Sequence, residues 1–253
     1  MVKSRHCFRA AFCCLLAVAL ARSPVWAIPP LVSGDIPTAD HRTYELFLGY
    51  VLKDGGVVTE EELPFWELVY GLTRVQELTI EAPILRRDDS AGTTTGIGDV
   101  ILGTKYRFVG EPAADSGLSA SLEVRLPTGD EERGLGSGAV NVDLRARGGF
   151  ELGGEVIYFN LGHTWVGEDG KDNTWFYSGV WDHPLGSTLR ILTEVYGKTA
   201  DEPGAPNAFA GTVGIKWRLP HRQQLQASIG RSLRDGRVGG PDLRVYAGWR
   251  RDF

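Results

Sequence analysis

The sequence of 253 residues predicts an all-β fold, a transmembrane antiparallel up-and-down β-barrel of about twelve strands behind a cleaved signal peptide. Three observations predict this fold. Apolar and polar residues alternate almost everywhere after residue 41, which is the period of a strand with two unlike faces. Most alternating segments are about 8–13 residues long, whereas strands of soluble proteins average about 5–6. Aromatic residues gather near the ends of the apolar rows, as they do at membrane interfaces.

The first 27 residues have the pattern of a secretory signal peptide. A basic start precedes an apolar stretch at 10–20, which is too short to span a bilayer as a helix. Val25-Trp26-Ala27 then forms a small-x-small cleavage site. A buried N-terminal helix is the alternative, but these flanks favour export, and we expect the protein in the bacterial outer membrane.

Removal of this segment changes both the charge and the cysteine content of the chain. It takes away four basic residues and no acid, so the net charge falls from −5 to −9, and this excludes a basic nucleic-acid-binding surface. All three cysteines also lie in it, at Cys7, Cys13 and Cys14. We therefore expect no disulfide, no thiolate metal site and no cysteine nucleophile in the mature chain.

The remaining chain divides into a short lead-in and one barrel domain. Residues 28–41 are rich in Pro, Asp and Ser and predict an irregular lead-in on the periplasmic side, and the sequence leaves open whether it folds back into the lumen. Residues 42–253 form the barrel. Its strands are predicted at 42–52, 63–70, 74–84, 97–109, 117–127, 139–151, 154–166, 173–182, 187–198, 207–218, 222–232 and 242–253.

Alternation alone does not separate a soluble β-protein from a membrane barrel, because the two patterns are inverted copies of each other. The connections favour the membrane. Long ones at 53–62, 85–96, 128–138, 167–172, 199–206 and 233–240 alternate with mostly tight turns, and 110–116 is the exception. Outer-membrane barrels have this asymmetry, with short turns on the periplasmic side. An even number of strands then places both termini on the periplasmic side.

The polar rows carry many charged residues, which in a membrane barrel would line the lumen. We predict lumen-lining positions for Glu45, Asp99, Lys105, Arg107, Glu123, Arg125, Asp143, Arg145, Arg147, Arg190, Glu194, Lys216 and Arg244. Symmetric pairing of 117–127 with 139–151 puts Glu123 opposite Asp143. Two interpretations stay open: a charge ladder that sets the field of an open pore, or side chains that fill and brace the interior, since twelve strands lie between closed and open barrels.

Aromatic residues on the apolar rows are predicted to lie at the two membrane interfaces. They are Trp66, Tyr70, Trp165, Trp175, Trp181, Trp217, Trp249 and Phe253. The terminal stretch RVYAGWRRDF resembles the last strand of bacterial outer-membrane proteins. That resemblance implies recognition of the C-terminal strand by the barrel-assembly machinery.

Several stretches together resemble an outer-membrane family named for the MetA pathway of phenol degradation. They are YGLTRVQELTIEAPI at 70–84, GIGDVILGTKYRF at 96–108, LEVRLPTGDEERGLGSG at 122–138 and NLGHTWVG at 160–167. The resemblance covers about residues 70–253. It implies a barrel that passes small molecules, hydrophobic or aromatic ones among them, and it supplies no set of functional residues.

The stretch RLPTGDEERGLGSG at 125–138 has glycines spaced as in a phosphate-binding loop. A dinucleotide site needs a helix after the glycines, but a strand follows, and Asp130, Glu131 and Glu132 would repel a phosphate. We therefore predict an exposed hairpin loop, with a weak divalent-cation site at the acids as the alternative. We expect no cofactor and no structural metal, because no His or Asp cluster has ligand spacing.

The sequence does not favour an enzyme. His163 lies on an outward row, and no serine stands at the adjacent outward position. We therefore predict passive passage of small solutes, with membrane lipid, the solutes and the assembly machinery as partners and no nucleic acid. The alternatives are a structural or surface-interaction barrel with a filled lumen and, with least support, an outer-membrane hydrolase.

Overall fold

The computed structural model describes residues 30–111, 114–234 and 242–253, and the described residues contain strands and no helix. The chain forms one antiparallel sheet. Its strands are β1 Tyr44–Asp54, β2 Thr59–Gly71, β3 Gln76–Glu81, β4 Ile84–Asp89, β5 Gly92–Ile97, β6 Val100–Val109, β7 Gly117–Leu126, β8 Asn141–Leu152, β9 Glu155–Trp165, β10 Thr174–Leu185, β11 Leu189–Lys198, β12 Ala208–Leu219, β13 Gln223–Ser232 and β14 Leu243–Asp252.

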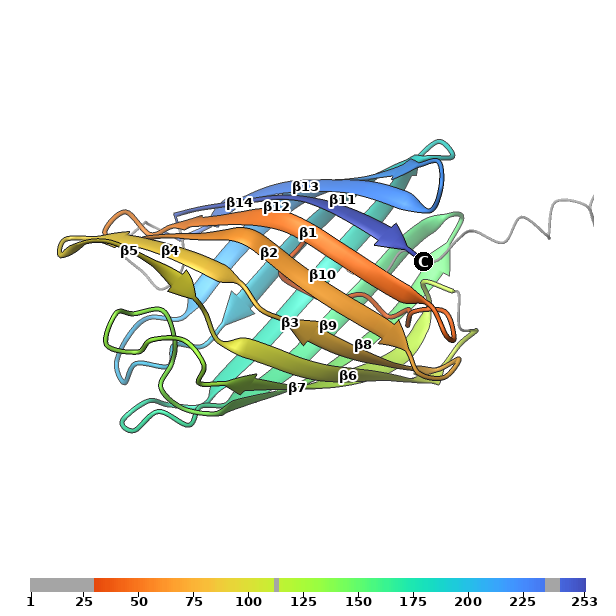
Figure 1. Ribbon diagram of the computed structural model, residues 1–253. Coiled ribbons are helices and arrows are strands. Elements are labelled where there is room, and N and C mark those ends of the chain that lie inside the picture. Colours follow the sequence, from red (N-terminus) through yellow and green to blue (C-terminus); the bar gives the residue numbers. More distant parts are fainter. Residues whose placement is uncertain (1–29, 112–113, 235–241) are drawn as a thin grey trace, which may run out of the picture.

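Twelve of these strands close into a barrel. Strand β1 pairs with β2 on one side and with β14 on the other, and each remaining barrel strand pairs with its neighbours in the order β3, β6, then β7 to β13 (Figure 1). Closure leaves no barrel strand with an unpaired edge, which a membrane requires because lipid cannot satisfy backbone hydrogen bonds. The predicted fold class and strand number are confirmed.

Two predicted connections are wrong. Residues 53–62 are not a long loop, because β1 and β2 continue to a turn at 55–58, and residues 85–96 form the hairpin β4–β5. The hairpin pairs with the start of β2, where Arg86 and Arg87 meet Glu61 and Glu60 in ion pairs of 3.1 Å. This hairpin extends beyond the barrel (Figure 1), so neither face needs an apolar row and the alternation that reveals a strand is missing.

The two ends of the barrel differ. One end holds both chain ends of the described barrel and the connections 72–75, 110–116, 153–154, 186–188 and 220–222, and we call it the short-turn end. The other, the long-loop end, holds the turn 55–58, the hairpin β4–β5 and the connections 127–140, 166–173 and 199–207, and β13 ends and β14 begins there. The contrast follows the predicted asymmetry except at the two corrected connections.

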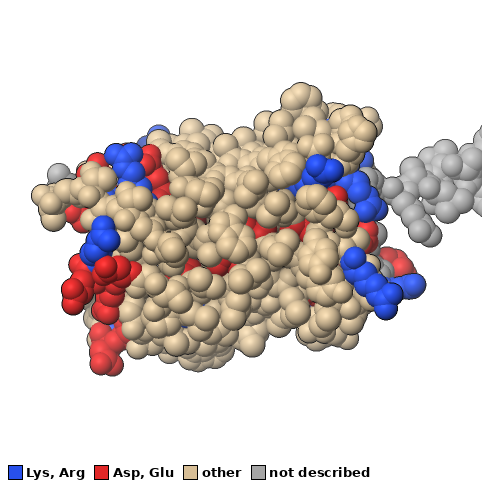
Figure 2. Space-filling view, viewed as in Figure 1, with Lys and Arg blue, Asp and Glu red and all other residues tan. Residues whose placement is uncertain are grey.

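The barrel is inside out with respect to a soluble protein. Large apolar side chains are exposed around its outer surface, such as Leu102, Leu122, Leu161, Val213 and Ile229. Figure 2 shows a broad belt of uncharged residues between two ends where charged side chains gather, with only some acidic atoms visible within the belt. The alternate, inward positions hold most of the buried charged residues. This arrangement is the one that suits lipid outside and a polar lumen inside.

Residues 30–41 contain no strand, and we call them the lumen segment. Residues 30–39 lie inside the barrel, and Asp40 and His41 are exposed where the segment joins β1. The sequence left this placement open. The segment leaves β1 at the short-turn end, where the backbone N–H of Arg42 donates to the carbonyl of Gly71 at 2.7 Å. It then crosses the lumen, and Val32 packs against Phe176 and Tyr196 on the opposite wall. The polar interior of the barrel is therefore partly occupied by a short N-terminal segment of the same chain.

Candidate functional site: the lumen

One wall of the lumen packs against the lumen segment through apolar side chains. Leu31 and Ile36 form a buried cluster with Val156, Tyr158, Val180 and Leu192 on β9, β10 and β11. Ile36 is 1% exposed and Leu192 is 0% exposed, so this contact excludes water completely. We call the β9–β11 side the packed wall.

The packed wall also holds the segment by a buried carboxylate. Glu194 on β11 is 1% exposed. It accepts hydrogen bonds from the backbone N–H of Val32 at 3.0 Å and of Ser33 at 2.9 Å, and a third from the Ser33 hydroxyl. A buried carboxylate is costly unless it is fully hydrogen-bonded, so these three bonds make Glu194 an anchor of the segment.

A second anchor lies across the lumen, at Lys105 on β6. Its ammonium is 3.3 Å from Oδ1 of Asp35 in the segment and 3.0 Å from Oε1 of Glu77 on β3. Glu77 in turn accepts the backbone N–H of Ala39 at 2.6 Å. Gly34 lies against Arg147, where a Cβ would come within 2.6 Å of Nε, so only glycine fits this crossing without a shift.

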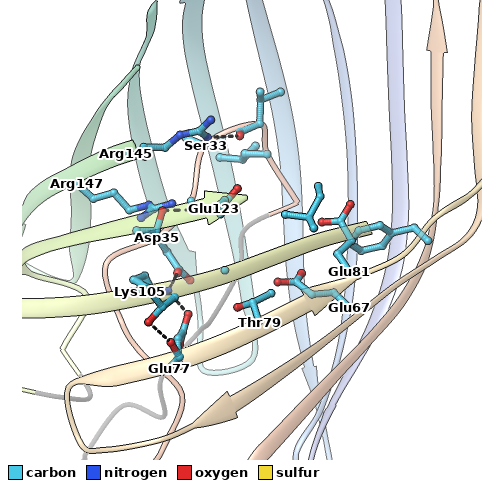
Figure 3. A pocket seen from close by; sticks show the side chains of 18 residues that line it. Ser33, Asp35, Glu67, Glu77, Thr79, Glu81, Lys105, Glu123, Arg145 and Arg147 are labelled. Atoms are coloured by element: carbon cyan, nitrogen blue, oxygen red, sulfur yellow. Dashed lines mark hydrogen bonds and ion pairs between the residues drawn. The ribbon is translucent and has the colours of Figure 1, made fainter. Parts of the chain in front are cut away.

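A cavity of about 220 Å³ remains beside the segment, between Asp35 and strands β2, β3, β6, β7 and β8. Glu67, Glu81 and Glu123 line it together with Arg145 and Arg147 (Figure 3). Leu31, Phe65 and Ile101 contribute apolar surface to the same cavity. We call the side formed by Glu67, Glu81 and Glu123 the acidic wall.

The carboxylates of the acidic wall lack the partners that other buried charges have. Glu67 is 7% exposed, and neither its carboxylate nor that of Glu81 has a hydrogen bond or ion pair with any residue that the structure describes. They are direct cross-strand partners on β2 and β3. Glu123 receives one long hydrogen bond of 3.4 Å from Ser121.

The thirteen residues predicted to line the lumen lie at different depths. Buried ones are Glu45, Asp99, Lys105, Arg107, Arg147, Glu194 and Lys216; half-buried ones are Glu123, Asp143, Arg145, Arg190 and Arg244; Arg125 is exposed near the long-loop end. Many of them pair inside the barrel. Arg250 is 2.8 Å from Glu45, Arg190 is 2.5 Å from Asp182, and Arg145 is 3.5 Å from Asp143.

The predicted register of β7 and β8 is confirmed, because Glu123 lies opposite Asp143. Arg145 lies opposite Ser121 and diagonal to Glu123, as this register requires, but its guanidinium turns to the lumen segment. It donates to the carbonyl of Val32 at 3.3 Å and lies 4.4 Å from the ring centre of Phe176. The segment, which the ladder hypothesis did not include, therefore takes up part of the charge on this wall.

Asp99 differs from the other predicted lumen residues in what it holds. Its carboxylate accepts the backbone N–H of Gly129 at 3.0 Å and that of Ser137 at 2.8 Å, so it anchors the 127–140 connection at the long-loop end. Gly136 passes so close that a Cβ would lie 2.5 Å from Oδ1 of Asp99. The glycines of this loop thus serve its close folding around a carboxylate.

Sequence reasoning missed Glu67, Glu77 and the polar groups of the lumen segment. Glu67 alternates with Trp66 and Leu68, so the period of two contained the signal, but its row also carries Phe65 and Val69 and looks apolar. Glu77 alternates with Leu78 in the same way. The irregular segment has no periodicity, and nothing in the sequence indicates where Asp35 lies.

Near the short-turn end, residues 114–116 contact a buried arginine of β6. Arg107, which is 2% exposed, donates to the carbonyls of Ala114 at 2.6 Å and Ser116 at 2.8 Å. Burial raises the pKa of Asp115 from 3.8 to about 6, although the nearby Lys216 and Arg190 act to lower it. Residues 114–116 thus lie against charged residues of the lumen.

The eight predicted interfacial aromatics occupy outward positions near both ends. Trp165 and Trp175 lie on the strand ends at the long-loop end, and Trp181 and Trp217 lie toward the other end; all four are exposed, as is Phe253, while Trp66, Tyr70 and Trp249 are half-buried. His163 packs against Trp165 and Trp175, with ring centres 4.7 and 4.4 Å away. Its surroundings are those of an aromatic cluster.

The described residues contain neither a metal-binding cluster nor a membrane-spanning helix. They contain no group of three or more His, Cys, Asp or Glu side chains placed to hold a metal ion. The acids at 130–132 therefore do not form such a group. They also contain no helix long and apolar enough to cross a membrane. The predicted signal peptide at 1–27 lies outside the described residues.

Comparison with known proteins identifies the family. Residues 58–239 match the family described as "Putative MetA-pathway of phenol degradation". The chain belongs to this family. The resemblance seen in the sequence is confirmed by this match, which covers most of the barrel, whereas a comparison with curated protein sequences found no significant match.

Solved structures similar to this family member are outer-membrane channels and porins. The COG4313 outer membrane channel from Pseudomonas putida F1 has 18% sequence identity and a TM-score of 0.71, and the match covers 88% of this chain and 100% of that one. The NanC porin has 10% identity and a TM-score of 0.56, covering 81% and 98%. The KdgM porin, solved with disordered oligogalacturonate, has 10% identity and a TM-score of 0.55, covering 83% and 99%. At these identities the likeness concerns the fold.

Proposed function

We propose that the protein is a channel of the bacterial outer membrane through which small solutes pass down their gradients, and that residues 30–41 narrow its lumen. The observation that carries this proposal is the inside-out barrel with unpaired carboxylates around an internal cavity. A barrel that only filled its interior would be more stable with apolar packing there, since buried unpaired charges cost free energy.

The same proposal gives the orientation of the barrel in the membrane and names its partners. The short-turn end faces the periplasm, residues 1–27 direct export, and the apolar belt contacts outer-membrane lipid. The C-terminal strand with Phe253 is the part that the barrel-assembly machinery recognises. No step of this function needs a cofactor, a metal or a catalytic group, and we propose that the protein is not an enzyme.

The charged residues of the lumen set the preference for solutes in this proposal, as charged rings do in channels. Arg145 and Arg147 are the residues to test, because both border the cavity. The apolar part of the lining, with Leu31, Phe65 and Ile101, supports small solutes with a hydrophobic or aromatic part. The description of the family, which refers to phenol degradation, supports the same class.

Conductance in planar lipid bilayers tests the proposal. Mature protein is expected to give small, stable steps, and a variant without residues 28–41 is expected to give steps several times larger. In Arg145→Glu with Arg147→Glu, the reversal potential should shift toward cations. Arg74→Glu with Arg222→Glu, a pair of exposed arginines in short connections, makes the same change of net charge away from the cavity and is the control.

The second candidate function is a structural or surface-interaction barrel whose lumen is filled. The lumen segment, held at Glu194 and Lys105, is the observation that favours it. Silence from the mature protein and from the truncated variant would support this candidate, provided that both migrate as folded, heat-modifiable barrels. The loops at the long-loop end would then be the surfaces to examine.

A further inference from the structure

The charges around the cavity do not balance. Five acids border it, namely Asp35, Glu67, Glu77, Glu81 and Glu123, against three bases, Lys105, Arg145 and Arg147. Lys105 is shared by Asp35 and Glu77. Arg145 is turned to Asp143 and to the carbonyl of Val32. Of the three bases only Arg147 remains, so one positive charge faces the three carboxylates of the acidic wall.

Glu67 is the residue at which this imbalance of charge is clearest. Its side chain points into the cavity (Figure 3), is more than nine-tenths buried, and has no partner among the described residues. The residue directly opposite is another acid, Glu81, and like charges in that position are destabilising. Asp35 adds a buried carboxylate oxygen, Oδ2, that likewise has no hydrogen-bond partner. Together these groups form a site that a positive charge would stabilise.

The remaining lining indicates what kind of cation fits. The described residues contain no cluster of ligands placed to hold a metal ion. A larger, organic cation therefore fits this site better than a metal ion. Leu31, Phe65 and Ile101 supply apolar surface, and an aromatic face such as that of Phe65 also attracts ammonium groups. A cavity of about 150 Å³ is known to hold benzene, so about 220 Å³ has room for one ring with a short substituent.

We propose that this cavity binds a small organic cation with an apolar body, of the class of primary arylalkylamines in their ammonium form. The ammonium, with three N–H donors, lies between Glu67 and Glu81, and the apolar body contacts Phe65 and Ile101. This inference rests on the proposed function and deepens it by naming the class of solute.

Calorimetric titration of the folded mature protein in detergent tests the site with three probes of one size: benzylammonium, benzyl alcohol and benzoate. Benzylammonium is expected to bind at least about tenfold more tightly than either of the others, because charge-assisted hydrogen bonds contribute that much. Glu67→Gln and Glu81→Gln should each lower its affinity about tenfold or more, and Glu168→Gln should leave it unchanged. Equal binding of the three probes, or insensitivity to both cavity variants, would overturn the inference.

A bilayer recording separates this inference from the proposed function. Conductance without any preference for benzylammonium in the titration would overturn the inference alone. Selective binding by a barrel that never conducts would overturn the channel and leave the binding site standing. Block of the conductance by benzylammonium, relieved in Glu67→Gln but not in Glu168→Gln, would support both.

Discussion

The two walls of the lumen accommodate their buried carboxylates in different ways. The packed wall meets the lumen segment with apolar side chains around Ile36, and its buried carboxylate, Glu194, is fully occupied by the segment. The acidic wall leaves a cavity between itself and the segment, and Glu67 and Glu81 face each other there without partners.

This difference indicates that one wall stabilises the lumen segment and that the other is suited to bind a ligand. Buried charges that are paired and hydrogen-bonded are retained at little cost, whereas unpaired ones weaken the fold. The packed wall can thus hold the segment in place, and the acidic wall is the part that gains from a ligand. Changes on the two walls should therefore have opposite effects, which the predictions for Ile36, Glu194 and Glu67 test.

The largest effect is expected for Ile36→Asp. The change places a charge in a cluster that is closed to water, and the segment must leave the packed wall because burying the unpaired carboxylate would cost several kcal/mol. We expect conductance steps several times larger than those of wild type, and rapid cleavage of the N-terminal segment by added protease. Ile36→Leu, which keeps volume and polarity, should behave as wild type. A protected segment in Ile36→Asp would mean that the polar anchors hold it without the packing.

Glu194→Ala should have the next largest effect. It removes the acceptor of three hydrogen bonds, of which charge-assisted ones contribute about 1.5–3 kcal/mol each. We expect release of the segment, seen as larger and noisier conductance and as faster proteolysis, with the barrel itself still folded. Glu202→Ala, on an exposed loop, is the matched control. If the two variants gave the same conductance, the anchoring role of Glu194 would be wrong.

Most of the barrel was predictable because the membrane imposes a period of two. Leu122 and Leu144 must face lipid, so Glu123 and Asp143 must face inward, and this reasoning needs no knowledge of any contact. The hairpin β4–β5 escaped because it lies beyond the barrel, where ion pairs such as Arg87 with Glu60 replace the apolar row.

The candidate site was predictable only in part. Lys105 and Glu123 follow from the pattern, but the segment that divides paired from unpaired charges does not. Its contacts join residues far apart in the chain, such as Ser33 and Glu194, and no local periodicity records them. For Asp99 the alternation predicts the inward position correctly but does not reveal the partners. Its carboxylate accepts hydrogen bonds from the 127–140 loop.

Asp115 gives a smaller, pH-dependent effect at the short-turn end. Its carboxyl has a pKa of about 6 in the folded protein against 3.8 when exposed, so the folded state binds the proton more strongly. The contribution of Asp115 is therefore most favourable below pH 3.8 and is lost as the pH rises to about 6. We expect faster hydrogen exchange in the 110–116 connection at pH 7 than at pH 5, after correction for the intrinsic rate. Asp115→Asn should remove the difference, and its persistence in that variant would exclude Asp115 as the cause.

The smallest effect, and the one of opposite sign, is expected on the acidic wall. Glu67→Gln removes one of two facing like charges, and such pairs are worth about 0.2–1 kcal/mol, so the empty barrel should become slightly more stable. Its unfolding midpoint in urea should rise, while that of Glu194→Gln falls. Benzylammonium should raise the midpoint of wild type and not that of Glu67→Gln, because a ligand stabilises only the state that binds it. A loss of stability in Glu67→Gln without ligand would mean that this carboxylate braces the barrel, and the functional contrast between the two walls would then fail.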